Sequence, residues 1–140
     1  MINQLLNTMY HLNIQIKEVE NKTKLVYEPG VLDEQLKEQI KEHKKEIMQR
    51  LQENEVAKSM GFLIYHHGLF YEYRYGLGAF LYIERLSNGF VNAWRENYLS
   101  GQDKPFKIKV IAKDASFQKA FKDSNSFINW IKNKPKRKVG

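Results

Sequence analysis

Between residues 62 and 113, short runs of alternating apolar and polar residues are separated by turn signals, and this pattern constrains the fold most strongly. Alternation with a period of two is typical of strands that bury one face. The interruptions His67-Gly68, Gly76-Leu77-Gly78 and Ser87-Asn88-Gly89 have the composition of tight hairpin turns. We therefore predict five antiparallel strands, at 62–66, 69–75, 79–85, 90–95 and 106–113.

After residue 113 the apolar residues return at helical spacing. Asp114 is predicted to cap one helix, and Ser124 or Asn125 to cap a second one. Because a sheet with one apolar face needs a cover, these helices are expected to pack on it. Trp94 and Trp130 are expected to anchor the core.

The first 55 residues predict a small α-β-β-α module. Residues 2–12 have helical spacing, and strands are expected at 13–19 and 24–27. Asp33 is predicted to cap the closing helix. One side of that helix is predicted to carry a narrow apolar stripe, which His43 and Lys44 flank. The stripe consists of Leu36, Ile40, Ile47 and Leu51.

These patterns predict an α+β fold with a small α-β-β-α N-terminal module, followed by an antiparallel β-sheet module with a C-terminal helix. The expected parts are 1–55, 56–134 and a basic, mobile tail at 135–140, with a junction at 54–60.

Composition excludes several classes of protein. The chain has 140 residues and no cysteine, so disulfides and thiolate metal sites are excluded. No apolar run approaches the roughly 18 residues that span a bilayer. The N-terminal stretch lacks the basic residues of a signal peptide. We therefore expect a cytoplasmic protein.

The formal net charge of +7 is unevenly distributed along the chain. Residues 1–60 and 61–98 are close to neutral, whereas residues 99–140 contain eleven Lys and Arg against three Asp. Such asymmetry indicates an acidic partner for the C-terminal part, and nucleic acid is the candidate that we favour.

Basic and aromatic residues supply the candidate nucleic-acid contacts. The lysines of 106–113 alternate with apolar residues, which predicts one exposed basic stripe on a strand. Three tyrosines of 69–75 alternate in register, either to stack on bases or to form a layer under the helices. The candidate set is Lys107, Lys109, Lys113, Lys132, Lys134, Lys136, Arg137, Lys138, Arg74, Tyr73 and Tyr75.

Catalytic and metal sites are not indicated. His66 and His67 are adjacent, so on a strand they would point to opposite faces and could not share an ion. Glu72, Glu84 and Glu96 each lie near an arginine, as in cross-strand pairs. We expect no cofactor, no metal and no enzymatic activity.

The N-terminal segments LLNTMYHLNIQI, KLVYEPG and LKEQIKEHKKEIMQRL resemble the TubC-type N-terminal docking domain of modular peptide and polyketide synthases. The resemblance covers about the first 52 residues. The matching positions are Leu5 and Leu6, Ile14 and Ile16, Leu25 and Tyr27, Pro29 and Gly30, and Lys44 before Ile47 and Leu51.

The resemblance implies a dimer-forming adaptor whose exposed β-hairpin captures the C-terminal motif of a partner protein by strand addition. It implicates Lys17, Lys22, Lys24 and Val26 in partner docking. Synthase chemistry is not expected, because Tyr71 and Glu72 follow His66-His67 where the condensation motif requires Asp and Gly.

The sequence therefore predicts a non-enzymatic adaptor of a phage or plasmid, which docks a protein through its N-terminal module and binds DNA or RNA through its basic C-terminal module. An alternative of another class is a phage-type inhibitor of a host defence complex, such as an anti-CRISPR, which acts by protein-protein contact. A small enzyme is the third hypothesis.

Overall fold

The computed structural model describes residues 2–134, and the predicted tail at 135–140 lies outside them. The chain divides into two compact units. Unit 1 comprises Met1–Val56 and His66–Gly68, and unit 2 comprises Ala57–Tyr65 and Leu69–Gly140. The boundary between the two units, after Val56, falls inside a helix. Residues 54–59 of the predicted junction belong to that helix.

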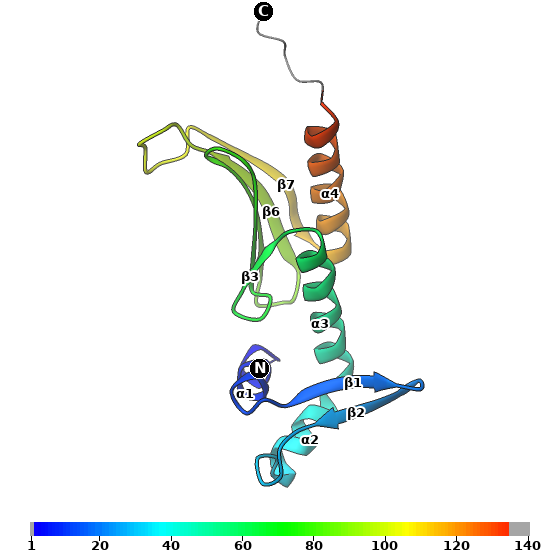
Figure 1. Ribbon diagram of the computed structural model, residues 1–140. Helices are drawn as coiled ribbons and strands as arrows, with labels where there is room; N and C mark the ends of the chain where they lie inside the picture. The colour runs from blue at the N-terminus through cyan, green and yellow to red at the C-terminus, as the bar shows by residue number, and fades with distance from the viewer. Residues whose placement is uncertain (1, 135–140) are drawn as a thin grey trace, which may run out of the picture. The chain divides into compact units, whose positions relative to one another are not determined.

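Unit 1 is built on three helices and one hairpin (Figure 1). The predicted order α-β-β-α is present, with one extra helix. Its core consists of Leu5, Leu6, Met9, Ile14, Ile40 and Ile47. The elements are α1 (Ile2–His11), β1 (Gln15–Val19), β2 (Lys22–Val26), α2 (Glu34–Glu42) and α3 (Lys44–Ser59).

The prediction of a single closing helix after Asp33 is wrong, because two helices, α2 and α3, occupy this segment. The Asp33 cap is confirmed, since its carboxylate accepts a hydrogen bond of 2.7 Å from the Leu36 N–H. However, α2 ends at Glu42, because the next residue, His43, has a φ of −104° and a ψ of 18°, and α3 begins at Lys44. Helical spacing did not reveal this break because the apolar stripe keeps its period across it.

Unit 2 contains a five-stranded antiparallel sheet with the order β3-β4-β5-β6-β7. Each strand pairs with its sequence neighbour, as expected from short hairpin turns. With the helices of the chain, this sheet confirms the α+β class. The strands are β3 (Leu63–Tyr65), β4 (Phe70–Gly76), β5 (Ala79–Arg85), β6 (Val91–Asn97) and β7 (Lys107–Ala115).

One continuous helix, α4 (Phe117–Asn133), follows the sheet, so the two predicted C-terminal helices are wrong. Ser116 caps α4 by accepting a hydrogen bond of 3.2 Å from the Lys119 N–H. Asp114 does not cap it, because this residue belongs to β7 and has a φ of 51°. Ser124 lies fully buried within the helix.

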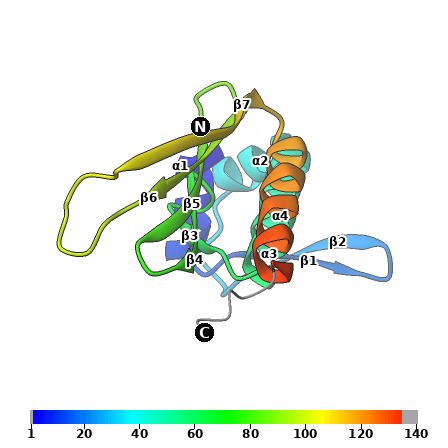
Figure 2. The same cartoon turned by 90° about the horizontal axis from the view of Figure 1, so that it is seen from above.

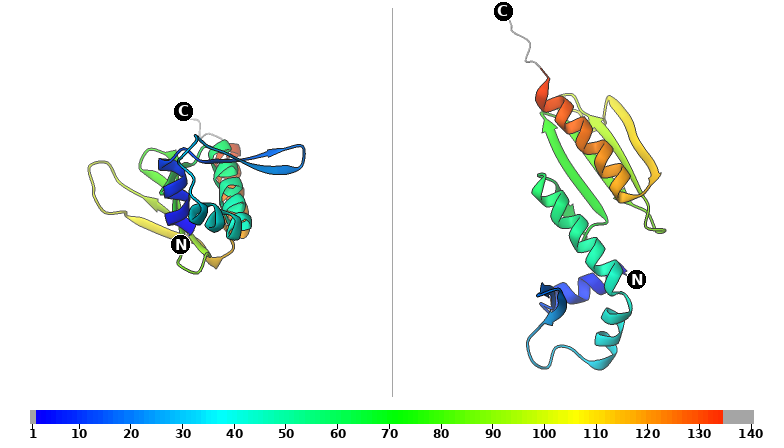
Figure 3. Two further views of the ribbon diagram at one scale, coloured as in Figure 1. Left: turned by 90° about the horizontal axis from the view of Figure 1, so that it is seen from below. Right: turned by 90° about the vertical axis from the view of Figure 1, so that its right-hand side faces the viewer.

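The helix α4 lies along one face of the sheet (Figure 2). Further views show the same packing within unit 2 (Figure 3). The side chains beneath α4 come from alternate positions of the strands, as the period of two requires. The buried core of unit 2 consists of Ala57, Phe62, Tyr71, Leu81, Ile83, Val91, Ala93, Phe117, Ala120 and Ile128.

Within residues 2–134, none of the helices combines the length and the apolar character that crossing a membrane requires.

Candidate functional site

The hairpin of unit 1 presents one polar face to solvent. Its two-residue turn places Glu20 and Asn21 at φ values of 52° and 64°, which is typical of a type I′ turn. Pairing then fixes which side chains share a face. Lys17 lies opposite Lys24, and Val19 lies opposite Lys22.

All four predicted docking residues lie on this exposed face. Val26 pairs with Gln15 and is 46% exposed, and the three lysines are exposed beside it. The opposite face of the hairpin carries Ile16 and Leu25, which pack against the core of unit 1. Lys17, Lys22, Lys24 and Val26 are therefore brought together by the fold.

The hairpin is a two-stranded sheet, so within residues 2–134 β2 pairs with a strand on one side only. In a hairpin with a two-residue turn, the pair that closes the turn is hydrogen-bonded and the pairs then alternate. Val19 and Lys22 close the turn, so the main-chain groups of Thr23 and Leu25 point outward from β2. An extended peptide can hydrogen-bond to these groups.

The charges on this face are unbalanced. Lys17 and Lys24 are direct cross-strand partners, and like charges in this position repel each other. Within residues 2–134, neither ammonium group takes part in a salt bridge. A partner carboxylate between these two lysines would remove the repulsion.

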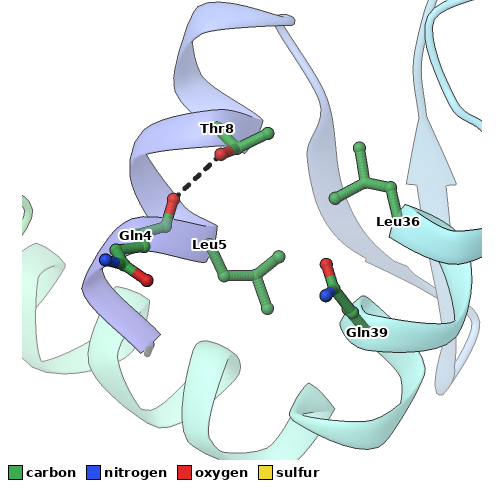
Figure 4. A pocket seen from close by; sticks show the side chains of 5 residues that line it. All are labelled: Gln4, Leu5, Thr8, Leu36 and Gln39. Atoms are coloured by element: carbon green, nitrogen blue, oxygen red, sulfur yellow. Dashed lines mark hydrogen bonds between the residues drawn. The ribbon is translucent and has the colours of Figure 1, made fainter.

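A pocket of about 230 Å³ lies between α1 and α2 (Figure 4). It is lined by Gln4, Leu5, Thr8, Leu36 and Gln39. The Thr8 hydroxyl donates to the Gln4 carbonyl at 3.0 Å, as Figure 4 shows. No lining residue is titratable, so the pocket offers no general acid or base.

In unit 2 the predicted basic stripe of 106–113 is divided. Lys107 pairs with Asn97, and Lys109 with Arg95, on the face that α4 covers. Register shifts between Val91 and Trp94 then change the alternation along β7, so Lys113 does not continue this stripe. The prediction of a single stripe is therefore wrong.

The alternating apolar residues of β7 are not buried either. Ile108 and Val110 are 61% and 62% exposed. They pair with Glu96 and Trp94 on the face of the sheet away from α4. The strand therefore exposes side chains on both faces, which its sequence did not indicate.

Trp130, expected in the core, is 58% exposed on α4. The Lys134 ammonium lies 5.0 Å from its ring centroid, and the Phe127 ring lies 6.2 Å from it. The Arg95 guanidinium stacks on Phe127 at 4.1 Å, and Lys109 lies opposite Arg95. We call Arg95, Lys109, Phe127, Trp130 and Lys134 the basic aromatic cluster.

The tyrosines proposed for base stacking pack under α4 instead. Tyr73 lies 5.2 Å from Phe62, and Tyr75 lies 5.1 Å from Phe127, between ring centroids. Both rings contact the core and are therefore unsuited to stacking on bases. This arrangement matches the alternative reading of a layer beneath the helix.

The other candidate nucleic-acid residues are dispersed. Arg74 lies opposite Phe80 on the face away from α4 and donates a hydrogen bond of 3.3 Å to the Gly76 carbonyl. The Lys132 ammonium lies 6.0 Å from the Tyr73 ring. Lys136, Arg137 and Lys138 lie outside the described residues.

His66 and His67 occupy a turn rather than a strand, with φ values of 51° and 57°. The His67 ring contacts the Asn7 amide oxygen at 3.2 Å, and its carbonyl accepts from Asn54 at 3.1 Å. Partial burial lowers the pKa of His67, and positive charge nearby lowers it further. Within residues 2–134, no group of three His, Asp or Glu side chains is placed to hold a metal.

Reading α4 as one helix would have revealed the exposed tryptophan. The helix buries Phe117, Ala120, Ser124 and Ile128 on one face. Trp130 is two residues beyond Ile128, which turns it about 200° away from that face. Because the sequence prediction divided residues 114–131 into two helices, it did not show that Trp130 lies opposite the buried face.

The hairpin and helices of unit 1 lie largely within a segment that matches a known protein family. Residues 2–53 match the family model of the TubC N-terminal docking domain, which confirms the resemblance predicted from the sequence. Comparison of the chain with curated proteins and with solved structures found no match. A docking domain implies a protein partner and suggests a role without catalysis.

Proposed function

We propose that this protein is an adaptor whose hairpin β1–β2 captures an extended, acidic segment of a partner protein. One observation carries the proposal. Lys17 and Lys24 face each other across an exposed hairpin, with Lys22 on the same face. The match to a docking family supports the same surface.

The proposed capture combines main-chain and side-chain recognition. The partner strand hydrogen-bonds to the outward groups of Thr23 and Leu25. Its carboxylates approach Lys22 and Lys24, and Val26 contacts an apolar side chain. Main-chain bonds supply affinity, and the lysines select acidic segments.

A synthetic peptide that alternates glutamate with valine is a suitable probe, with its lysine-valine counterpart as a negative control. We expect Lys24→Glu to weaken binding by about tenfold or more, because attraction becomes repulsion. The amide NMR signals of Thr23 and Leu25 should shift on binding to the unmodified protein.

The matched control for this experiment is Lys45→Glu, which makes the same change of charge at an exposed position of α3. This variant should bind the acidic peptide as the unmodified protein does. Equal affinities of Lys24→Glu and Lys45→Glu would contradict capture at the hairpin.

For unit 2 we propose nucleic-acid binding through the basic aromatic cluster. The observation that favours it is an exposed tryptophan flanked by Lys134 and, through Phe127, by Arg95. An exposed ring can stack on an unpaired base, and the neighbouring cations can contact phosphates. The basic segment 99–140 supplies further positive charge.

Single-stranded and double-stranded oligonucleotides should be titrated over a range of salt concentrations. We expect binding to weaken steeply as salt rises, and removal of residues 132–140 to reduce the salt dependence. Trp130→Ala should weaken single-strand binding by about tenfold. Absence of binding to every nucleic acid at low salt would favour a protein target, as in the inhibitor hypothesis.

A further inference from the structure

The face of the sheet away from α4 carries an aromatic surface. Pairing places three rows of side chains across this face, each row running perpendicular to the strands. The central row is Leu63, Glu72, Tyr82, Trp94 and Val110. The outer rows are Tyr65, Phe70, Glu84 and Asn92, and Arg74, Phe80, Glu96 and Ile108. We call these three rows the open face.

The rings of the open face touch one another. Phe70 and Trp94 lie 5.3 and 5.6 Å from Tyr82, and Phe80 stacks on the same ring at 5.9 Å, between centroids. An antiparallel sheet with one covered face normally exposes polar residues on the other. The four rings are half-buried, and Leu63 and Val110 at the two ends of the central row are exposed. An accessible apolar surface of this kind marks an interaction site.

Carboxylates are placed among these rings. The Glu96 carboxylate accepts hydrogen bonds from the Trp94 indole N–H at 3.0 Å and from the Tyr98 hydroxyl. Glu72 accepts from the Tyr65 hydroxyl at 3.0 Å. The hydrogen bond from Tyr65 to Glu72 and the one from Tyr98 to Glu96 favour the protonated phenols, and they raise the pKa of Tyr65 and of Tyr98.

The sign of the charge on the open face selects its ligand. Its three rows contain three glutamates and one arginine, and the exposed Lys113 lies on the same side of β7, so carboxylates still outnumber cations there. Arg95, Lys107 and Lys109 lie on the other face. Phosphates would be repelled by the glutamates of the open face. Cations would be attracted both by these carboxylates and by the negative faces of the rings.

We propose that the open face binds an extended basic segment of a partner protein. Arginine or lysine side chains of that segment lie over Tyr82 and Trp94, with their charged groups directed to Glu72 and Glu96. Ile108 and Val110, both exposed at the edge of the sheet, contact the apolar side chains between the cations. This proposal is independent of capture at the hairpin.

The spacing of the surface suits a peptide. Glu72 and Trp94 are two strands apart in one row, a distance of about 10 Å. Alternate residues of an extended chain point to the same side and are about 6.8 Å apart, so two long cationic side chains at alternate positions can reach both ends of this span.

A fluorescent peptide that alternates arginine with valine is the probe. The matched peptide carries citrulline, which keeps the shape of arginine without its charge. Binding to the full chain is measured by anisotropy, and the two indole N–H signals are followed by NMR. We expect the arginine peptide to bind and to shift the Trp94 signal, and the citrulline peptide to bind at least about tenfold more weakly.

The test variant combines Glu72→Gln with Glu96→Gln, which removes two charges and keeps groups that can accept the same hydrogen bonds. The control combines Glu38→Gln with Glu42→Gln, which makes the same change of net charge on α2. The test variant should weaken peptide binding by about tenfold relative to the control.

Equal affinity of the test and control variants for the arginine peptide would overturn the proposal. A peptide that shifts the indole N–H signal of Trp130 and not that of Trp94 would also overturn it. Displacement of the arginine peptide from Trp94 by a single-stranded oligonucleotide that itself shifts the Trp94 signal would also overturn it, since the open face would then bind nucleic acid.

Discussion

Glu20 shows how a single residue limits the hairpin that carries the docking lysines. Its φ of 52° is a left-handed conformation that costs an ordinary L-residue about 1 kcal/mol. Asparagine tolerates this conformation and is preferred at the first position of a type I′ turn. The native sequence therefore forms its hairpin with local strain at the turn.

We expect Glu20→Asn to raise the free energy of unfolding by about 0.5–1 kcal/mol, because it relieves this strain. Urea denaturation would measure the change. Glu28→Asn is the control, since it removes the same charge at an exposed position without positive φ. If both variants change stability equally, charge rather than backbone conformation is responsible.

His67 provides a second prediction that concerns a single residue. Its pKa is lowered below 6.5 by desolvation and then by His11, His66 and Arg50. The unfolded chain therefore binds more protons than the folded chain below about pH 6.5, and stability must fall as the pH falls through this window. Thermal unfolding between pH 7 and 5 would show this loss.

The variant His67→Asn should reduce this pH dependence, and asparagine also tolerates the positive φ. His43→Asn removes a histidine at the end of α2 for comparison. If the thermal unfolding midpoint of His67→Asn changes with pH as steeply as that of the unmodified protein, other groups cause the acid sensitivity.

Among the elements, α4 contains two buried side-chain atoms that lack a hydrogen-bond partner within residues 2–134, the Ser124 hydroxyl oxygen and Asn125 Oδ1. The Ser124 hydroxyl is fully buried, and within residues 2–134 it has no hydrogen-bond partner. A buried polar group without a partner costs about 1–3 kcal/mol. We expect Ser124→Ala to stabilise the protein by about 1 kcal/mol more than Ser126→Ala, an exposed position in the same helix, as measured by urea denaturation.

The elements also show which features could be predicted from sequence. The strands and their hairpin order were predicted because alternation and turn residues are local signals. The break at His43 and the continuity of α4 were not, since both depend on packing rather than on period. In β7 the register shifts moved Lys113 out of the predicted stripe, and bulges leave no clear mark in the residue pattern.

The candidate site was predicted unevenly for the same reason. The four docking residues share a face because strand alternation determines it. Tyr73 and Tyr75 were placed in register correctly, but only the position of α4 shows that their face is covered. The open face was missed because its rows are defined by pairing between strands.

For the whole molecule, the proposals place binding surfaces in different units. Lys24 belongs to unit 1, and Trp130 belongs to unit 2. We therefore expect Lys24→Glu to weaken binding of the acidic peptide without changing the affinity for single-stranded DNA, and Trp130→Ala to do the reverse. The double variant should combine the two effects additively. Loss of both activities in either single variant would show that the surfaces are not separate.

The continuity of α3 has a practical consequence for protein engineering. The family match ends at residue 53, but the helix continues to Ser59. A chimaera that transplants only the matched residues would sever the helix within its ordered turns. A graft that carries residues 1–59 keeps the helix intact, and the fusion point then falls where the native helix already ends.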